Sequence, residues 1–127
     1  MKVLLDTHVL FWWYSKPEKL SKRAVSMVTE GSNAVLISAA TAWELSIKAA
    51  MGKVDALPLV VDFSMFVDDE GFTELPVVAS HAIRAGLLPL HHKDPFDRLL
   101  VAQAQDLNVP IISSDRGLDE YGIVRIW

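Results

Sequence analysis

The fold class is decided by the stretch Asp94-Pro-Phe-Asp-Arg-Leu-Leu-Val-Ala-Gln-Ala-Gln-Asp-Leu-Asn-Val-Pro-Ile-Ile-Ser-Ser-Asp115. Asp94 has a good N-cap side chain, and Pro95 suits the first position of a helix that we expect to end near Leu107. The apolar run 109–113 then predicts a strand, with Asp115 two residues beyond it. A helix that leads into a buried strand followed by an acid is typical of an α/β fold.

The same alternation of apolar runs and helical segments extends over the rest of the chain. The predicted strands are 2–5, 34–37, 73–77, 109–113 and 122–127, and Pro76 favours an edge position for the third. The predicted helices are 9–14, 21–30 with Ser21 as N-cap, 39–51, 58–71, 80–87 and 95–107. Because helices separate the strands, we expect an α/β fold with three α/β/α layers and a mostly parallel central sheet of four to five strands.

Length and composition limit the classes of protein that this chain can represent. Its 127 residues suggest a single domain over 1–127, and a hydrophobic content of 51% is too high for a disordered chain. The absence of cysteine excludes disulfide scaffolds, cysteine-ligated zinc and thiol catalysis. The longest uncharged run has thirteen residues, 31–43, whereas a spanning helix needs about 20. With no signal-peptide pattern at the N-terminus, we expect a soluble, cytoplasmic protein without membrane contact. A net charge of −4 argues against a non-specific nucleic-acid coat, but it is compatible with a nucleic-acid enzyme that holds metal ions.

Five acidic residues lie near the ends of the predicted strands or on the helices beside them, with Glu44 about one and a half turns into its helix: Asp6, Glu44, Asp94, Asp97 and Asp115. The carboxyl ends of parallel strands form one edge of the sheet, so these side chains can converge there. Two carboxylates about 5 Å apart repel each other by roughly 3 kcal/mol at an effective dielectric constant near 20. Such a cluster therefore predicts a bound cation, and oxygen ligands without cysteine favour Mg²⁺, with Mn²⁺ as a possible substitute. The four histidines show no paired spacing along a helix, which makes a histidine-based site the less favoured alternative.

Each acid also has an ordinary structural interpretation. Asp94 can serve only as an N-cap, and Asp97 falls at the capping-box position three residues later. Asp115 can be a turn former before Arg116-Gly117, and Glu44 can pair with Lys48 one helical turn away. These interpretations leave the convergence of all five acids at one sheet edge unexplained.

Four motifs resemble those of PIN-domain proteins, and in particular the VapC-type toxins of toxin–antitoxin pairs. They are Leu5-Asp-Thr-His8, Ser38-Ala-Ala-Thr-Ala-Trp-Glu-Leu45, His92-Lys-Asp-Pro-Phe-Asp-Arg-Leu-Leu-Val-Ala-Gln-Ala104 and Ile111-Ile-Ser-Ser-Asp115. The resemblance covers the whole chain in the family's order. It implies a Mg²⁺-dependent endoribonuclease that cleaves RNA with a metal-activated water and is held inactive by a cognate antitoxin protein. It also implies a homodimer.

Carried over by position, the resemblance makes Asp6, Glu44, Asp97 and Asp115 catalytic metal ligands, with Asp94 as a further ligand. Thr7, Ser38 and Ser114 stand beside the acids and would hydrogen-bond a ligating carboxylate or a water. Arg98 and Arg116 would hold phosphate, or else form plain surface ion pairs. Partner contacts are expected at Trp12, Trp13 and the helix containing Leu59–Phe66. No RNA-reading motif such as an aromatic platform is visible in the sequence.

Two other functions compete with the nuclease. A phospho-receiver domain is also an α/β protein of similar length with an acidic pocket, but it usually has paired acids after its first strand and a lysine after its last. Here Asp6 stands alone, and no lysine follows Asn108. The other alternative is a catalytically idle PIN-like binding module, against which the intact set of acids argues.

Overall fold

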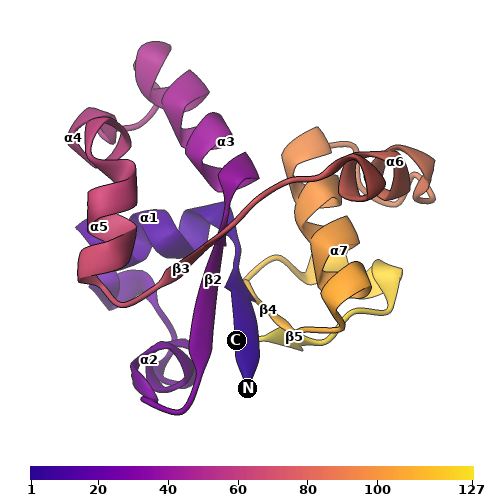
Figure 1. Ribbon diagram of the computed structural model, residues 1–127, viewed down its shortest axis with the longest axis horizontal. Coiled ribbons are helices and arrows are strands. Elements are labelled where there is room, and N and C mark those ends of the chain that lie inside the picture. The colour runs from indigo at the N-terminus through magenta and orange to yellow at the C-terminus, as the bar shows by residue number, and fades with distance from the viewer.

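A single parallel sheet organises the protein. The computed structural model describes residues 1–127, and its five strands lie in the order β3-β2-β1-β4-β5 (Figure 1). All four strand pairs are parallel. The strands are β1 (Lys2–Leu5), β2 (Ala34–Ser38), β3 (Thr73–Leu75), β4 (Ile111–Ile112) and β5 (Arg125–Ile126). The predicted parallel sheet and the edge position of the third strand are confirmed.

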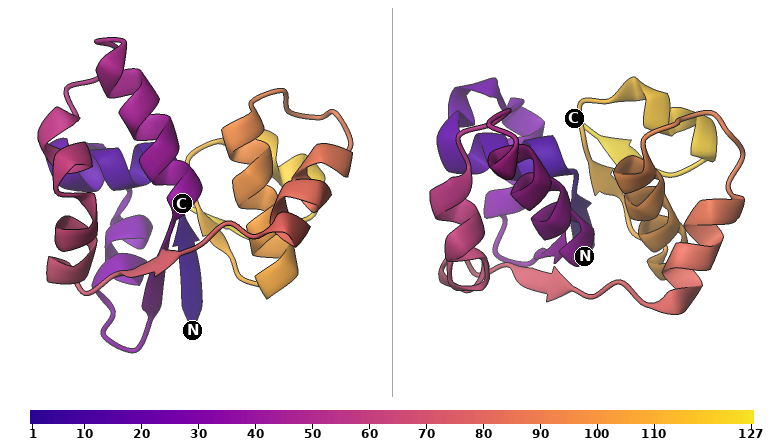
Figure 2. Two further views of the ribbon diagram at one scale, coloured as in Figure 1. Left: turned by 45° about the horizontal axis from the view of Figure 1, so that its top comes forward. Right: turned by 90° about the horizontal axis from the view of Figure 1, so that it is seen from above.

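Helices cover both faces of the sheet, which gives the expected three layers (Figures 1 and 2). One face carries α1 (Thr7–Ser15), α2 (Lys22–Thr29), α4 (Leu57–Val61) and α5 (Phe63–Asp69), and the other carries α6 (Ala79–Leu87) and α7 (Pro95–Leu107). The helix α3 (Ala39–Ala50) rises from the end of β2, and two 3-10 helices, η1 (Pro17–Lys19) and η2 (Arg116–Tyr121), complete the fold.

Alternation along the strands separates two hydrophobic cores. Val3 and Leu5 of β1 point into the larger core with α1, α2 and α5, whereas Leu4 points into the smaller core with α7. All three residues are fully buried. This explains why the first strand is an unbroken apolar run instead of an alternating one.

The strand order reverses at β1, which lies between β2 and β4. In open α/β sheets, ligands bind outside the carboxyl ends of the strands at such a switch point. Side chains that follow β1, β2 and β4 can therefore meet at this edge of the sheet.

The structure corrects the expectation of one helix over 58–71. Asp62 has a non-helical backbone (φ −111°, ψ 33°), and it separates α4 from α5. The break lets Leu59 and Val67 both reach the larger core. No helix in this fold combines the length and the apolar character needed to cross a membrane.

Candidate functional site

Four of the five predicted acids line one small cleft at the carboxyl edge of the sheet. The cleft has a volume of about 180 Å³, and its walls include Asp6, Glu44, Asp94 and Asp97. Asp6 follows β1, Glu44 lies on α3, and the other two lie at the beginning of α7. Segments far apart in the sequence thus deliver carboxylates to the switch point of the sheet.

Asp6 is held in place by several donors. It is 2% exposed and forms the N-cap of α1, where its Oδ1 accepts a 2.7 Å hydrogen bond from the backbone N–H of Thr7. Its Oδ2 accepts a 2.6 Å hydrogen bond from the hydroxyl of Ser113 and lies 3.3 Å from Nδ1 of His8. Burial raises the pKa of Asp6, and this effect outweighs the lowering by His8 and by the two hydrogen bonds.

Glu44 combines the expected ion pair with an unsatisfied oxygen. Its Oε2 lies 2.6 Å from Nζ of Lys48, so the pairing along α3 is real. Its Oε1 is buried and has no hydrogen-bond partner. Because buried carboxylate oxygens usually have a partner, this atom is suited to bind a cation in the cleft.

Asp94 and Asp97 have different roles at the start of α7. The carboxylate of Asp94 caps the helix by accepting hydrogen bonds from the backbone N–H of Phe96 (2.8 Å) and Asp97 (3.3 Å). Asp97 does not complete a capping box with Asp94, because the backbone N–H of Asp94 donates to Nδ1 of His92 instead of the carboxylate of Asp97. Burial, followed by the negative charges of Asp6 and Asp94, raises the pKa of Asp97 to about 7.

Asp115 lies apart from the cleft lining but is joined to it through His92. The Nε2 atom of His92 is 3.0 Å from Oδ2 of Asp115 and 3.3 Å from Oδ2 of Asp97. One potential ligand atom from each of His92, Asp97 and Asp115 lies within 4.8 Å of the other two, a spacing suited to a metal ion. Partial burial tends to raise the pKa of Asp115, but hydrogen bonds from Gly117 and His92 lower it overall.

His92 also carries a shifted pKa and was missed by the reasoning from spacing. Burial tends to lower its pKa, but the hydrogen bond with Asp115 and the charge of Asp97 raise it overall. The available signal was its position two residues before Asp94, within the same motif. The candidate site therefore contains imidazole as well as carboxylate groups.

The hydroxyl groups are arranged differently from the expectation. Thr7 hydrogen-bonds to the hydroxyl of Thr41, Ser38 caps α3 by accepting from Ala40, and Ser114 hydrogen-bonds to Nε2 of His8. None of these three hydroxyls contacts a carboxylate. Ser113 does so instead, and its Oγ also accepts a hydrogen bond from the backbone N–H of Asp115.

The predicted phosphate contact of Arg98 is wrong, because its guanidinium is buried. Only 8% of Arg98 is exposed, and its guanidinium donates to backbone carbonyls at the end of α6 and in the loop before α7. These acceptors are the carbonyls of Ala85 and Leu88 for Nη2 and of Pro89 for Nη1. Neither a phosphate site nor a surface ion pair describes this residue. Arg116 is exposed at the start of η2, and its phosphate role stays a prediction.

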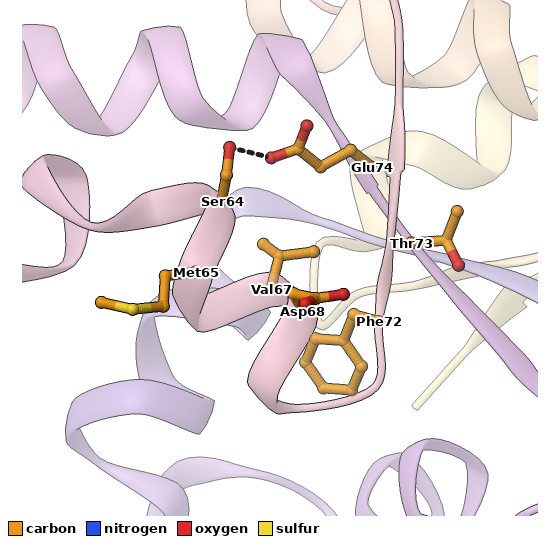
Figure 3. Close-up of a pocket in the computed structure, with 7 residues that line it drawn as sticks. All are labelled: Ser64, Met65, Val67, Asp68, Phe72, Thr73 and Glu74. Atoms are coloured by element: carbon orange, nitrogen blue, oxygen red, sulfur yellow. Dashed lines mark hydrogen bonds between the residues drawn. The ribbon is translucent and has the colours of Figure 1, made fainter.

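The largest hollow of the molecule lies elsewhere and lacks convergent chemistry. It has a volume of about 650 Å³ between α5 and β3, and the labelled side chains come from these two elements and, for Phe72, from the turn that joins them (Figure 3). Its acids are Asp68 and Glu74, and the carboxylate of Glu74 accepts a hydrogen bond from Ser64. The acidic cleft at the switch point remains the candidate site.

Comparison with known proteins agrees with this geometry. The family model described as the PIN domain matches residues 3–124. The chain belongs to the PIN-domain family. It is 30% identical over 118 residues to a curated protein named Ribonuclease VapC22 from Mycobacterium tuberculosis, with 91% of this chain and 88% of that protein covered.

Solved structures show the same PIN-domain fold. VapBC2 from Rickettsia felis, bound to a DNA fragment from its promoter, matches with a TM-score of 0.72 at 13% identity, covering 98% of this chain and 97% of that one. FitAcB from Neisseria gonorrhoeae matches with a TM-score of 0.64 at 16% identity, covering 97% and 95%. At these identities the likeness establishes the fold, and the family assignment rests on the sequence matches.

Proposed function

We propose that this PIN-domain protein is a Mg²⁺-dependent endoribonuclease that acts as the toxin of a toxin–antitoxin pair. The observation that carries the proposal is the cleft in which Asp6, Glu44, Asp94 and Asp97 meet while one buried oxygen of Glu44 has no partner. The name of the Mycobacterium tuberculosis relative, a ribonuclease, supports the same reaction class.

The donor set fits a divalent cation. Asp6, Glu44, Asp94 and Asp97 line the cleft and would hold it, and His92 and Asp115 offer further ligand atoms beside Asp97. Oxygen-rich sites of this kind suit Mg²⁺ or Mn²⁺. A bound divalent cation supplies an activated water and neutralises charge on a scissile phosphate.

The protein's own groups orient this set. Ser113 and the backbone N–H of Thr7 fix the carboxylate of Asp6, and Lys48 compensates the charge of Glu44. His92 bridges Asp97 and Asp115, so that side chains from α7 and from the end of β4 act together. Holding the ligands in place by surrounding hydrogen bonds is what a metal site needs for activity.

We also propose that the chain forms a homodimer and binds an antitoxin. The solved structures it resembles include VapBC complexes, in which such a toxin is paired with another protein. Trp43 and Ile47 of α3 and its C-cap Met51 form an exposed apolar stripe with a four-residue spacing, in which Trp43 and Met51 are 60% and 62% exposed. An apolar stripe of this kind on a helix favours a protein interface.

Part of the expected partner surface belongs to the core instead. Leu59 is buried, and Trp13 packs against Phe72 and the larger core. Within the α4–α5 region, Val61 and Met65 remain strongly exposed and available to a partner.

The experiment is an RNA cleavage assay with purified protein in Mg²⁺, Mn²⁺ or EDTA, using a structured RNA. Cleavage should require the metal and fall by orders of magnitude in Asp6→Asn, which removes a charge with little change of shape. Asp68→Asn is the matched control, because the same substitution is made at an exposed acid outside the cleft. Cleavage that persists in EDTA, or in Asp6→Asn, contradicts the proposal.

Of the two alternative functions, one disagrees with the fold and the other is tested by the cleavage assay. The phospho-receiver interpretation is wrong, because the strand order β3-β2-β1-β4-β5 differs from the 2-1-3-4-5 order of that fold and the family is PIN. The idle binding module predicts a wild-type protein that binds its partner but leaves RNA intact in Mg²⁺ and Mn²⁺, so the same assay distinguishes it.

A further inference from the structure

An aromatic cluster adjoins the acidic cleft. His8 lines the cleft, and its ring centroid lies 4.8 Å from that of Trp12. Trp127, directly after β5, has its ring centroid 6.0 Å from Trp12 and 6.5 Å from His8. In the right-hand view of Figure 2 the C-terminal end accordingly lies beside α1. The cluster thus extends outward from the carboxylate of Asp6 through His8 to two indole rings.

Trp12 lies outside both hydrophobic cores. It is partly exposed and packs against neither hydrophobic core, whereas Trp13 and Trp127 both pack against the larger core. Its ring plane is inclined by 63° to His8 and by 56° to Trp127, so these rings do not stack face to face. The indole of Trp12 therefore contributes little to the folded core and retains surface for contact with a ligand.

One cation lies against these rings. The ammonium group of Lys19 lies 5.4 Å from the ring centroid of Trp12. The segment from Lys16, just before η1, to the first turn of α2 also carries Lys22 and Arg23, against a single acid, Glu18. In a chain of net charge −4, this basic segment can attract a polyanion.

We propose that Trp12, together with Trp127 and Lys19, forms a stacking site for an unpaired RNA base next to the cleavage site. The inference rests on the proposed ribonuclease function and adds a substrate-positioning contact to it. Aromatic rings accept any base, because every base has a π-face, and nearby lysines pair with the phosphates. A protein partner would explain an exposed indole, but it would not explain why the rings lead directly to the acidic cleft and why a lysine lies against Trp12.

The test measures RNA binding separately from cleavage. In an Asp97→Asn background, a fluorescently labelled single-stranded oligoribonucleotide is titrated with the full chain, and anisotropy gives the Kd. Trp12→Ala should weaken binding by about 5- to 150-fold, the range for loss of one base–aromatic stack. Trp12→Tyr should restore most of the affinity, because it retains an aromatic face. Tyr14→Ala, at an exposed aromatic residue on the same helix that packs on Phe66, should leave the Kd unchanged.

Salt and kinetics provide two further measurements. Lys19→Gln should reduce the dependence of log Kd on salt concentration, since one fewer phosphate contact releases fewer counterions. In the otherwise wild-type enzyme, Trp12→Ala should raise KM for RNA by a larger factor than it lowers kcat, which a general loss of folding would not do.

The outcomes separate the two proposals. If wild type cleaves RNA and Trp12→Ala has an unchanged Kd and KM, the stacking site is refuted and the ribonuclease function stands. If Trp12→Ala leaves RNA binding intact but shifts the sedimentation of the chain toward monomer, the rings are a protein contact and the stacking site is again refuted. If wild type neither binds nor cleaves RNA in Mg²⁺, the proposed function itself fails.

Discussion

Replacing Asp97 with asparagine should stabilise the metal-free protein at neutral pH. Asparagine has nearly the same shape as aspartate but no charge, so it removes one carboxylate from a buried cluster. Burial and the charges of Asp6 and Asp94 raise the pKa of Asp97 from 3.8 to about 7. The folded state therefore binds the Asp97 proton more tightly than the unfolded state does.

The sign and the size of the effect follow from this shift. Between pH 4 and pH 7 the unfolded chain has lost the proton while the folded chain still holds it, so wild-type stability falls as pH rises. A shift from 3.8 to about 7 corresponds to about 4 kcal/mol, at 1.36 kcal/mol for each pKa unit. The lost interaction with the dipole of α7 costs the variant roughly 0.3–1 kcal/mol. Asp97→Asn should thus be about 3 kcal/mol more stable than wild type at pH 8, and the advantage should vanish near pH 4.

The assay is urea denaturation followed by circular dichroism, in EDTA, at pH 4.5, 6 and 8. Adding Mg²⁺ at pH 8 should stabilise wild type clearly and the variant only weakly, because a ligand stabilises the state that binds it. Asp68→Asn, at an exposed acid, should follow the wild-type pH dependence. A variant that is less stable than wild type in EDTA at pH 8, and that shows the full Mg²⁺ effect, would refute the argument and reduce Asp97 to a helix-terminal charge.

Three further predictions concern the contact with Asp6, the buried Arg98 and the surface of α3. Ser113→Ala removes the 2.6 Å hydrogen bond to Asp6 and should cost about 1–3 kcal/mol of stability in denaturant titration and reduce cleavage, whereas Ser114→Ala should affect cleavage much less. Arg98→Met leaves several buried carbonyls without a donor and should lower the unfolding free energy by about 3 kcal/mol or more; a loss below 1 kcal/mol would contradict its structural role. Ile47→Glu places a charge in the apolar stripe of α3 and should shift the protein from dimer to monomer in sedimentation at micromolar concentration, and an unchanged sedimentation coefficient would remove α3 from the interface.

Features encoded within a few neighbouring residues were predictable from the sequence. Ser21 caps α2 and Asp94 caps α7, because each side chain bonds to backbone N–H groups within the next three residues. The strand 2–5 has the predicted bounds, since an uninterrupted apolar run ends at a charged residue. The convergence of the acids at one edge also followed, because parallel strands end on the same side of a sheet.

Contacts between residues far apart in the sequence were not predictable. Asp6 and Ser113 are 107 residues apart in the sequence, and their hydrogen bond exists only because β4 lies beside β1. From the sequence we expected Ser114 beside the acids, whereas in the structure the hydroxyl of Ser113 meets the carboxylate. Arg98 looked like a surface cation because nothing in its local sequence shows that carbonyls from the end of α6 surround it.

The four acids of the cleft and the neighbouring Asp115 differ in how their negative charge is compensated, and this difference identifies the carboxylate with the least compensation. Asp6, Asp94 and Asp115 each cap a helix, so backbone N–H groups and the positive end of a helix offset their charge. Glu44 has Lys48, although one of its oxygens stays without a partner. Asp97 has no cap and no hydroxyl donor, only the shared contact with His92, and burial together with Asp6 and Asp94 raises its pKa to about 7. Much of the electrostatic cost of assembling the site therefore falls on Asp97, and a cation that relieves this cost binds the folded state in preference to the unfolded one.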